Sequence, residues 1–330
     1  MTSAEDAARL VAVGFEGNRS TPELRELLEL GVRSVILFAR NAGTPSEVKR
    51  MTDEIRAASP GRVLFCIDQE GGETVRLTDG FAAPPPMREI GAIGKDAAGD
   101  VGRILAEDLR AVGIDLDLAP VVDVDSNPAN PVIGPRSFGS DPERVSECAG
   151  RFIRKMQEAG VAACAKHFPG HGDTILDSHH DLPVLPHAME RLDRVELPPF
   201  KASIAAGVAC IMTTHVVFEA LDPGVPATLS PVCIDGLLRG DLGFDGVVIS
   251  DDLEMAAIAE LPAIAGDVGE AAVRSIEAGV DLVLCCHRPE RQKKVVEALV
   301  EAVERGRIGI DRLESSLRRL DRLFERYVAF

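Results

Sequence analysis

Residues 161–183 read VAACAKHFPGHGDTILDSHHDLP, and within them a short apolar run gives way to a loop crowded with titratable side chains. The run 161–168 is typical of a buried parallel strand, which places Lys166 and His167 near its carboxyl end. Pro169 and the glycines after it stop a helix from forming. The loop then holds three histidines and three aspartates with no helical or strand period. We therefore interpret the stretch as a strand followed by an active-site loop.

Strand patterns alternate with helix patterns on both sides of this stretch. Apolar runs predict eight strands, at 10–14, 34–38, 63–67, 115–122, 161–168, 209–213, 246–250 and 281–285. Apolar spacing and Thr-Pro starts predict helices at 21–30, 44–58, 96–112, 142–159, 189–206, 230–239, 267–278, 290–305 and 310–327. No change of composition marks a domain boundary.

The alternation predicts an α/β fold, a single (β/α)8 TIM-type barrel with extended βα loops and C-terminal helices. We expect one catalytic barrel domain over residues 1–330. A doubly wound open sheet is the alternative, but it requires a glycine-rich loop after the first strand. Gly14 and Gly17 are too sparse to form one.

Polar clusters follow the predicted strands. They are Arg40-Asn41, Asp68 to Glu70, Asp123 to Arg136, Lys166 to Asp181, His215 and Asp251-Asp252. In (β/α)8 barrels the loops after the strands build the active site at one end of the barrel. The convergence of these clusters on that end predicts the site.

Composition excludes several classes of partner. The formal net charge is −17, from 53 Asp and Glu against 36 Lys and Arg, so nucleic acid and anionic membranes would be repelled. The seven cysteines lie mostly in apolar runs without zinc-type pairs, which indicates buried free thiols in a reducing compartment. The acidic N-terminus lacks the features of a signal peptide. We expect a cytoplasmic protein with no cofactor and no metal.

The strand-end carboxylates Asp68, Asp251 and Asp252, together with Arg136 and Lys166, would form a cavity suited to a ligand dense in hydroxyl groups. A sugar fits that description. Retaining glycoside hydrolysis needs a carboxylate nucleophile at the anomeric carbon and a second group that gives and then removes a proton. Asp251 suits the first role, because a strand end would hold it rigidly.

The second role falls to Asp177 and His179, which are separated by one residue. A carboxylate two residues before an imidazole in a tight loop can accept a hydrogen bond from one ring nitrogen. The other nitrogen is then left to move a proton near neutral pH.

Other interpretations use the same residues. His167, His171, Asp173 and His179 could instead bind a metal, as in barrel hydrolases, although four candidates in one glycine-rich loop are loosely spaced. Asp252 could cap the following helix. Structural roles are also open to Lys166 as the partner of a carboxylate, to Arg136 as a loop clamp, and to His180, His187 and His287 as ordinary loop or surface histidines.

Several motifs together resemble a known family. They are ILFARN at 36–41, DQEGG at 68–72, IGPRSFG at 133–139, KHFPGHGDT with DSH at 166–179, and ISDDLEM at 249–255. In this order they are similar to the family 3 glycoside hydrolases of the β-N-acetylglucosaminidase (NagZ) type. The chain departs from the family pattern after DQEGG, where Glu73-Thr74 replace an Arg and an apolar residue, although Arg76 is in place.

The resemblance implies a (β/α)8 barrel that removes terminal β-linked N-acetylglucosamine with retention. It implies Asp251 as the nucleophile and His179 as the acid/base with Asp177 as its partner. It also implies that four residues bind the terminal sugar, namely Asp68, Arg136, Lys166 and His167. Short members of this branch act in cell-wall recycling, on N-acetylglucosamine linked to 1,6-anhydro-N-acetylmuramic acid with or without peptide.

The alternatives on the same scaffold are a phosphorylase and a β-glucosidase. A metal-dependent hydrolase and a non-catalytic sugar-binding barrel come from other classes. The chain has no Trp and only one Tyr, so stacking platforms for a long polysaccharide are scarce. A short pocket that takes one terminal sugar by hydrogen bonds is the better hypothesis.

Overall fold

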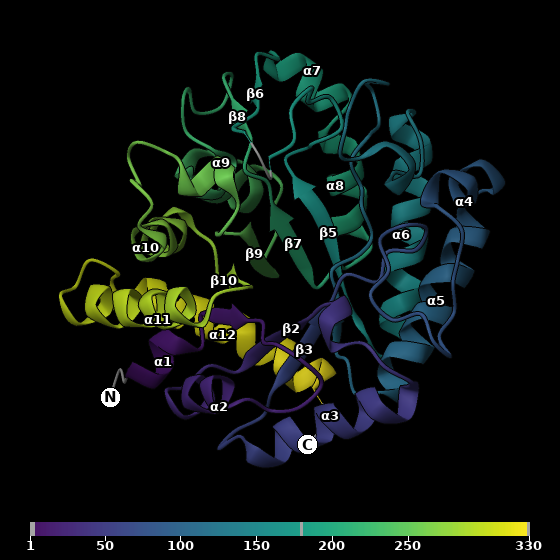
Figure 1. Cartoon of the computed structure of the whole chain (residues 1–330). Coiled ribbons are helices and arrows are strands. Elements are labelled where there is room, and N and C mark those ends of the chain that lie inside the picture. The colour runs from purple at the N-terminus through teal and green to yellow at the C-terminus, as the bar shows by residue number, and fades with distance from the viewer. Residues whose placement is uncertain (1–3, 179–180, 329–330) are drawn as a thin grey trace.

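The computed structural model of the chain describes residues 4–178 and 181–328, and eight parallel strands in it close into a barrel (Figure 1). These strands are β1 (Val11–Val13), β2 (Ser34–Leu37), β3 (Leu64–Ile67), β4 (Leu116–Asp117), β5 (Ala162–Phe168), β7 (Cys210–Thr213), β9 (Val247–Asp252) and β10 (Leu282–Cys285). They follow the order β1-β10-β9-β7-β5-β4-β3-β2 around the barrel. The predicted eight-stranded barrel is therefore confirmed.

Helices surround the barrel. They are α1 (Ala4–Ala8), α2 (Pro22–Glu29), α3 (Pro45–Ala58), α4 (Met87–Ile93), α5 (Lys95–Ala111), α6 (Pro142–Glu158), α7 (Met189–Arg194), α8 (Leu197–Ala205), α9 (Ala256–Ala259), α10 (Val268–Ala278), α11 (Pro289–Glu304) and α12 (Ile310–Tyr327). Single turns of 3-10 helix lie at η1 (Ala39–Asn41), η2 (Gly134–Arg136) and η3 (Ala227–Leu229), and η4 (Val232–Asp241) is π-helical.

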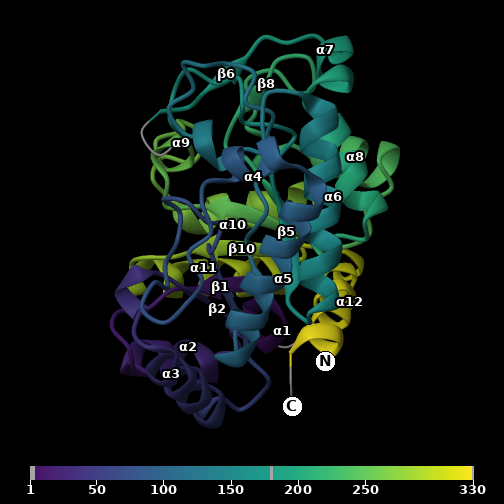
Figure 2. The ribbon, with the colours of Figure 1, turned by 90° about the vertical axis from the view of Figure 1, so that its right-hand side faces the viewer.

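The helix starts follow the sequence signals. Thr21 caps α2, because its side-chain oxygen accepts a hydrogen bond from the backbone N–H of Leu24. Asp141 caps α6 in the same way, and Thr44 and Glu47 form a capping box at α3. On one side of the barrel α5, α6 and α8 pack side by side (Figure 2).

Some element boundaries differ from the predictions. The helix expected at 189–206 is broken into α7 and α8, because Pro198 and Pro199 lack backbone N–H groups and are tolerated only in the first turn of a new helix. The strand expected at 115–122 is reduced to β4, since Pro120 cannot donate to a strand ladder. The helix expected at 230–239 is replaced by η4.

Several short elements have no counterpart in the sequence prediction. They are α1, α4, α9 and a separate two-stranded sheet of β6 (Val184–Leu185) and β8 (Val217–Phe218). Each has at most seven residues, too few for a clear hydrophobic period. The small sheet lies in the loops beyond β5 and β7, above the end of the barrel toward which their arrows point in Figure 1.

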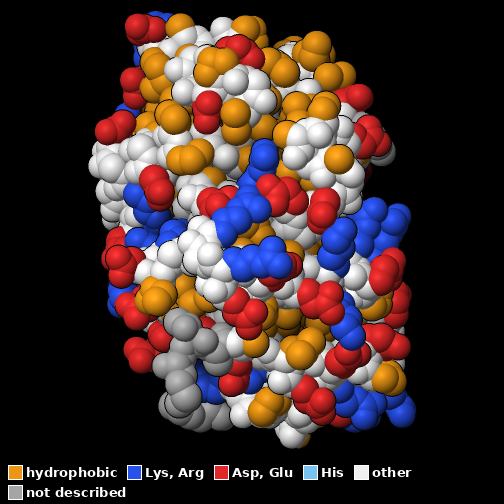
Figure 3. All heavy atoms as spheres, turned by 90° about the vertical axis from the view of Figure 1, so that its left-hand side faces the viewer, with side chains coloured by type: hydrophobic (Ala, Val, Ile, Leu, Met, Phe, Trp, Pro, Cys, Tyr) orange, Lys and Arg blue, Asp and Glu red, His pale blue; other side chains and the backbone are white. Residues whose placement is uncertain are grey.

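At the opposite end of the barrel α12 packs against β9 and the residue that precedes β10. The fully buried Asp281 accepts hydrogen bonds from Arg239 (2.5 Å) and from Ser316 of α12 (2.7 Å). All seven cysteines are free and buried. None of the described helices has the length and apolar character needed to cross a bilayer. On the face drawn in Figure 3, acidic and basic side chains are interspersed and do not form an extended basic patch.

Candidate active site

A cavity of about 430 Å³ opens at the carboxyl ends of the barrel strands. Five of the predicted site residues line it, namely Asp68, Arg136, Lys166, His167 and Asp251. They come from separate segments of the chain, and the closed barrel brings these segments to one rim. The volume of the cavity is within the usual range for small-molecule pockets.

The two other predicted catalytic residues are Asp177 and His179. Asp177 is partly buried in the loop after β5 and is not among the residues that line the cavity. His179 lies outside the described residues.

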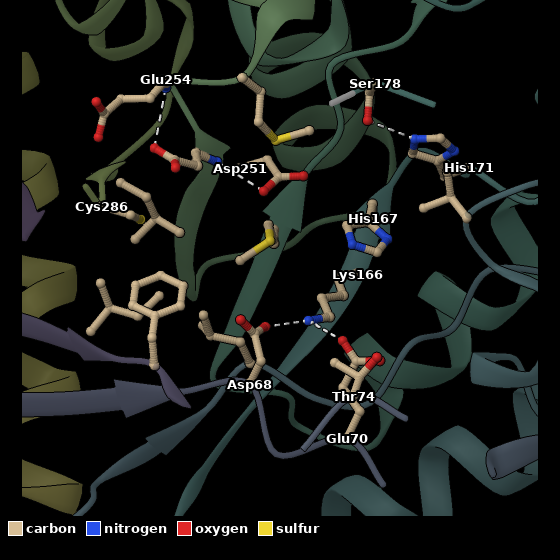
Figure 4. Close-up of a pocket in the computed structure, with 18 of the residues that line it drawn as sticks. Asp68, Glu70, Thr74, Lys166, His167, His171, Ser178, Asp251, Glu254 and Cys286 are labelled. Carbon is tan, nitrogen blue, oxygen red and sulfur yellow. Dashed lines mark hydrogen bonds and ion pairs between the residues drawn. The ribbon is translucent and has the colours of Figure 1, made fainter. Parts of the chain in front are cut away.

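A buried cluster of ion pairs forms one wall (Figure 4). Lys166 lies between Asp68 and Glu70, with its Nζ 2.7 Å from Oδ1 of the first and 2.5 Å from Oε1 of the second. Arg136 donates to both carboxylate oxygens of Glu70, each over 2.8 Å. Arg76 donates to Asp68 over 3.2 Å. Every charged group in this wall is thus held by at least one group of opposite charge.

Glu70 and Arg76 are additions to the predicted site. Glu70 is fully buried, and Arg76 lines the cavity beside Asp68. A signal for the first was present in the sequence, since Glu70 follows Asp68 by two residues directly after β3, and such residues tend to point the same way. For Arg76 the only signal was its place in the DQEGG-type motif.

Electrostatics keep the cluster ionised. Burial opposes the charged form of Glu70, but Arg136 and Lys166 outweigh it and hold the pKa of this carboxyl well below its usual range. The pKa of Asp68 is lowered as well, against its own burial, by Lys166 and Arg76. The wall therefore presents fixed donors and fixed acceptors, which suits the hydroxyl groups of a sugar.

Asp251 faces this wall from the end of β9 (Figure 4). Its Oδ1 accepts a hydrogen bond from the backbone N–H of Asp252 over 2.8 Å. The adjacent Asp252 lines the same cavity. Asp252 is engaged by His287 at 3.2 Å and by the backbone N–H of Glu254. In Figure 4 Asp251 lies on the side of the cavity that faces His167 and Lys166, where a ligand bound against the cluster would meet it.

The structural alternatives for single residues can now be compared with their positions. Lys166 does pair with carboxylates, yet it also lines the cavity. His287 was expected on the surface. It is half-exposed, but it lies in the cavity wall, where its hydrogen bond to Asp252 raises its pKa. His215 is buried and hydrogen-bonds with the Thr228 hydroxyl and the Asp252 carbonyl, so it supports β9 from behind.

A second cluster centres on the buried Asp123. Its carboxylate accepts from the Nδ1 of His167 (2.7 Å) and from the backbone N–H of His171 (2.7 Å). His171 in turn hydrogen-bonds through Nε2 with the hydroxyl of Ser178 (3.0 Å), as Figure 4 shows. Asp123 thereby orients the imidazole of His167 toward the cavity and fixes the start of the loop.

The described residues do not support the hypothesis of a metal site. In the part of the chain that the structure describes, no three His, Cys, Asp or Glu side chains are placed to hold a metal ion. The ring nitrogens of His171 hydrogen-bond with Thr174 and Ser178. The carboxylate of Asp173 is hydrogen-bonded to His187, with 2.6 Å between its Oδ2 and the Nε2 of the imidazole.

We expect His171 to make stability depend on pH. Burial, helped by the nearby His167, lowers its pKa from 6.5 to about 4. As the pH falls from 6.5 towards 4, the unfolded chain binds a proton that the folded chain does not, so stability is lost in this window. The expected loss is about 2 kcal/mol between about pH 7 and about pH 5. Urea denaturation of the parent protein and of His171→Gln at both pH values measures it. Equal pH slopes for the two proteins would contradict the expectation.

Comparisons with known proteins agree with this geometry. The family model described as the glycosyl hydrolase family 3 N-terminal domain matches residues 2–323. A β-hexosaminidase from Thiobacillus denitrificans is 40% identical over 282 residues, which cover 83% of this chain and 77% of that protein.

Two solved structures are also similar. One is a family 3 β-N-acetylglucosaminidase from Paenibacillus sp. str. FPU-7, with a TM-score of 0.95 and 45% identity. The match covers 99% of this chain but 63% of that one, so the present chain spans less than two thirds of that longer protein. The other is NagZ from Neisseria gonorrhoeae in complex with N-trifluoroacetyl-D-glucosamine. It has a TM-score of 0.79 and 32% identity, and the match covers 94% of this chain and 97% of that one.

Proposed function

Because the chain belongs to family 3 of the glycoside hydrolases, we propose that it is an exo-acting β-N-acetylglucosaminidase that retains the configuration of the sugar. One observation carries the proposal. Asp251 faces the cluster of Lys166, Asp68, Glu70 and Arg136 across the cavity. A sugar whose hydroxyl groups bind to that cluster would have its ring between the cluster and a carboxylate.

In the first step of the proposed reaction, a carboxylate oxygen of Asp251 attacks the anomeric carbon. The bond from this carbon to the leaving oxygen breaks, and His179 gives its proton to that oxygen. In the second step, water attacks the anomeric carbon and gives a proton to His179, while Asp251 leaves as a carboxylate. Two inversions give net retention. Asp177 would hold the imidazole in the correct orientation through the other ring nitrogen.

The substrate is proposed from the cavity and the relatives together. Asp68, Arg136, Lys166 and His167 would bind the terminal sugar, assisted by Arg76. The structure of the Neisseria relative contains an N-acylated glucosamine, which supports N-acetylglucosamine as that sugar. We propose that the natural substrate is N-acetylglucosamine linked to 1,6-anhydro-N-acetylmuramic acid, with or without peptide, in the recycling of peptidoglycan.

A small binding site fits this substrate. Phe38 is the one phenyl ring that lines the cavity among the described residues, and Arg40 covers it with its guanidinium 4.4 Å from the ring centroid. The single Tyr of the chain, Tyr327, ends α12 at the other side of the barrel. The described residues therefore offer little aromatic surface for a long polysaccharide.

The proposal predicts that the protein hydrolyses 4-nitrophenyl β-N-acetylglucosaminide at least about 100-fold faster than the matching β-glucoside, since a site built for an acetamido group loses contacts with a hydroxyl. Release of nitrophenol is followed by absorbance, with and without phosphate, and the sugar product is identified by chromatography. Free β-N-acetylglucosamine as the first product supports the proposal.

The other outcomes separate the alternatives. N-acetylglucosamine 1-phosphate as the main product in phosphate buffer would replace the hydrolase with a phosphorylase. Faster cleavage of the glucoside would indicate a β-glucosidase, and no cleavage of either compound would refute a glycosidase of this specificity.

A further inference from the structure

The loop after β5 has a firmly held base. At Gly172 a side chain would meet the backbone carbonyl oxygen of Val124 at 1.8 Å, so only glycine lets the two backbones pack this closely. The next residue, Asp173, accepts hydrogen bonds from Ser126 over 2.9 Å and from His187 over 2.6 Å. These contacts fix the chain before it reaches the catalytic part of the loop.

The middle of the same loop has little packing of its own. Ile175 and Leu176 point outward, with 73% and 40% of their surfaces exposed. Side chains this exposed add little to local order. Asp177 and Ser178 follow directly, and the backbone carbonyl of Ser178 accepts a hydrogen bond from the backbone N–H of Ala257 over 3.3 Å. This contact holds the backbone of Ser178 but leaves its side chain to be held by another group.

His171 connects the two ends of this exposed segment. Its Nε2 lies 3.0 Å from the hydroxyl oxygen of Ser178, and both residues are about 1% exposed. Its Nδ1 lies 2.9 Å from the hydroxyl oxygen of Thr174. Its own backbone is held on both sides, because its N–H donates to Asp123 and its carbonyl accepts from Asn130. The ring therefore links the fixed base to a residue seven positions further on.

We propose that His171 is a positioning residue for acid–base catalysis, because it ties Ser178, which lies between Asp177 and His179 in the sequence, to the fixed base of the loop. This inference rests on the proposed function, in which those two neighbours form the acid/base dyad. A proton donor must be within hydrogen-bond reach of the leaving oxygen. Loss of the link between His171 and Ser178 would move that donor without removing it.

The groups around His171 allow it to act as a neutral link. The charged or titratable side chains that act on it are His167, Asp123 and Asp251, and its burial disfavours the imidazolium. In a neutral imidazole one nitrogen donates and the other accepts, and the two hydroxyl partners can take either role. Both ring nitrogens can thus stay hydrogen-bonded throughout a reaction cycle in which the neighbouring dyad gains and loses a proton.

The test compares aryl β-N-acetylglucosaminides whose leaving phenols differ in pKa. A misplaced acid should matter most where the leaving group needs a proton most. For His171→Leu and Ser178→Ala we expect kcat/KM to fall about 30-fold with a phenol of high pKa and less than about 5-fold with dinitrophenol. The inhibition constant of N-acetylglucosamine should change less than about 2-fold, because His171 and Ser178 line another part of the cavity than the ion-pair cluster that would bind the sugar. His171→Gln, which can keep a hydrogen bond to Ser178, should recover part of the loss.

Two controls set the scale. Ser203→Ala removes a buried hydroxyl that donates to the Pro199 carbonyl within α8, far from the cavity, and should leave all substrates unaffected. His179→Ala removes the proposed acid altogether, so it shows how strongly kcat/KM can depend on the pKa of the leaving phenol. If the loss for Ser178→Ala and His171→Leu is equal for all leaving groups, or is confined to the inhibition constant or to thermal stability, the positioning role is wrong.

Failure of the proposed function looks different. In that case the parent protein cleaves none of the aryl glycosides, or His179→Ala shows no dependence on the leaving group, and the inference falls with it. If the loss of kcat/KM depends steeply on the pKa of the leaving phenol for His179→Ala but not for His171→Leu or Ser178→Ala, only the role of His171 is wrong. Should His171→Leu not fold, Ser178→Ala answers the question by itself.

Discussion

Asp251→Asn is expected to lower kcat for an aryl β-N-acetylglucosaminide by at least about 10⁴-fold, because an amide oxygen cannot form the glycosyl-enzyme ester on which the proposed reaction depends. The effect should not come from unfolding, since the carboxylate is only partly buried at the end of β9 and the amide is nearly isosteric. Steady-state rates with purified protein and a thermal melt of the same sample measure both quantities.

The neighbouring carboxylate is the matched control. Asp252 lines the same cavity but is engaged by His287 and by the backbone of Glu254. Asp252→Asn should therefore lower kcat far less, by about 10-fold or below. This loss would come from the weakened contact between residue 252 and His287. Equal losses for the two variants would remove the basis for choosing Asp251.

A second readout tests the nucleophile directly. In Asp251→Gly the space of the carboxylate can admit azide, which would attack the anomeric carbon from that side and give an α-glycosyl azide. Detection of the β-anomer instead would mean that the enzyme attacks from the other face, and the assignment would be wrong.

Lys166→Met is expected to have the second-largest effect. The ammonium is fully buried and bridges Asp68 and Glu70, so its removal leaves carboxylate oxygens without their donor. We expect a loss of about 3 kcal/mol in the free energy of unfolding, the lower end for a broken buried ion pair because Arg76 and Arg136 stay in place. The loss of a fixed donor should also lower kcat/KM by at least about 100-fold. Urea denaturation and steady-state kinetics measure these effects.

A double-mutant cycle shows whether the loss comes from the ion pair. Lys166→Met combined with Asp68→Asn should destabilise by less than the sum of the two single changes, since each removes what the other leaves unpaired. Lys155→Met is the surface control, because Lys155 pairs with the exposed Glu158 on α6 and should cost less than about 0.5 kcal/mol. Additive single effects would mean that the pair contributes little to folding.

The barrel, and the end of it that carries the site, could be predicted from the apolar runs of the chain. The strand runs were recognisable because strands buried on both faces are continuously apolar. Once they were placed in parallel, their carboxyl ends had to meet at one rim. Asp68, Lys166 and Asp251 could therefore be assigned to one cavity although 183 positions separate the first from the last, counted from 251 − 68.

Local sequence was a weaker guide to element boundaries. The predicted helix over 189–206 ignored the strong preference of proline for a first turn, and Pro198 and Pro199 divide it into two helices. The predicted strand over 115–122 was shortened for a similar reason, since Pro120 has no N–H for the ladder. In both cases the apolar pattern was continuous while the backbone hydrogen bonding was not.

The pairing of the charged groups, in contrast, depends on contacts that form when the chain folds. Glu70 meets Arg136 from 66 positions away, and His287 reaches Asp252 from the loop after β10. Asp123 meets His167 of β5 and the backbone of His171 in the loop after it. Such partners depend on the order in which strands close around the barrel and on how far each loop reaches over the rim. A hydrophobic period carries information about which face of a segment is buried, but none about which distant side chain will lie opposite. The fold and the position of the site can therefore be predicted from the sequence. The hydrogen bonds and ion pairs that hold the site residues in place form only when the barrel has closed.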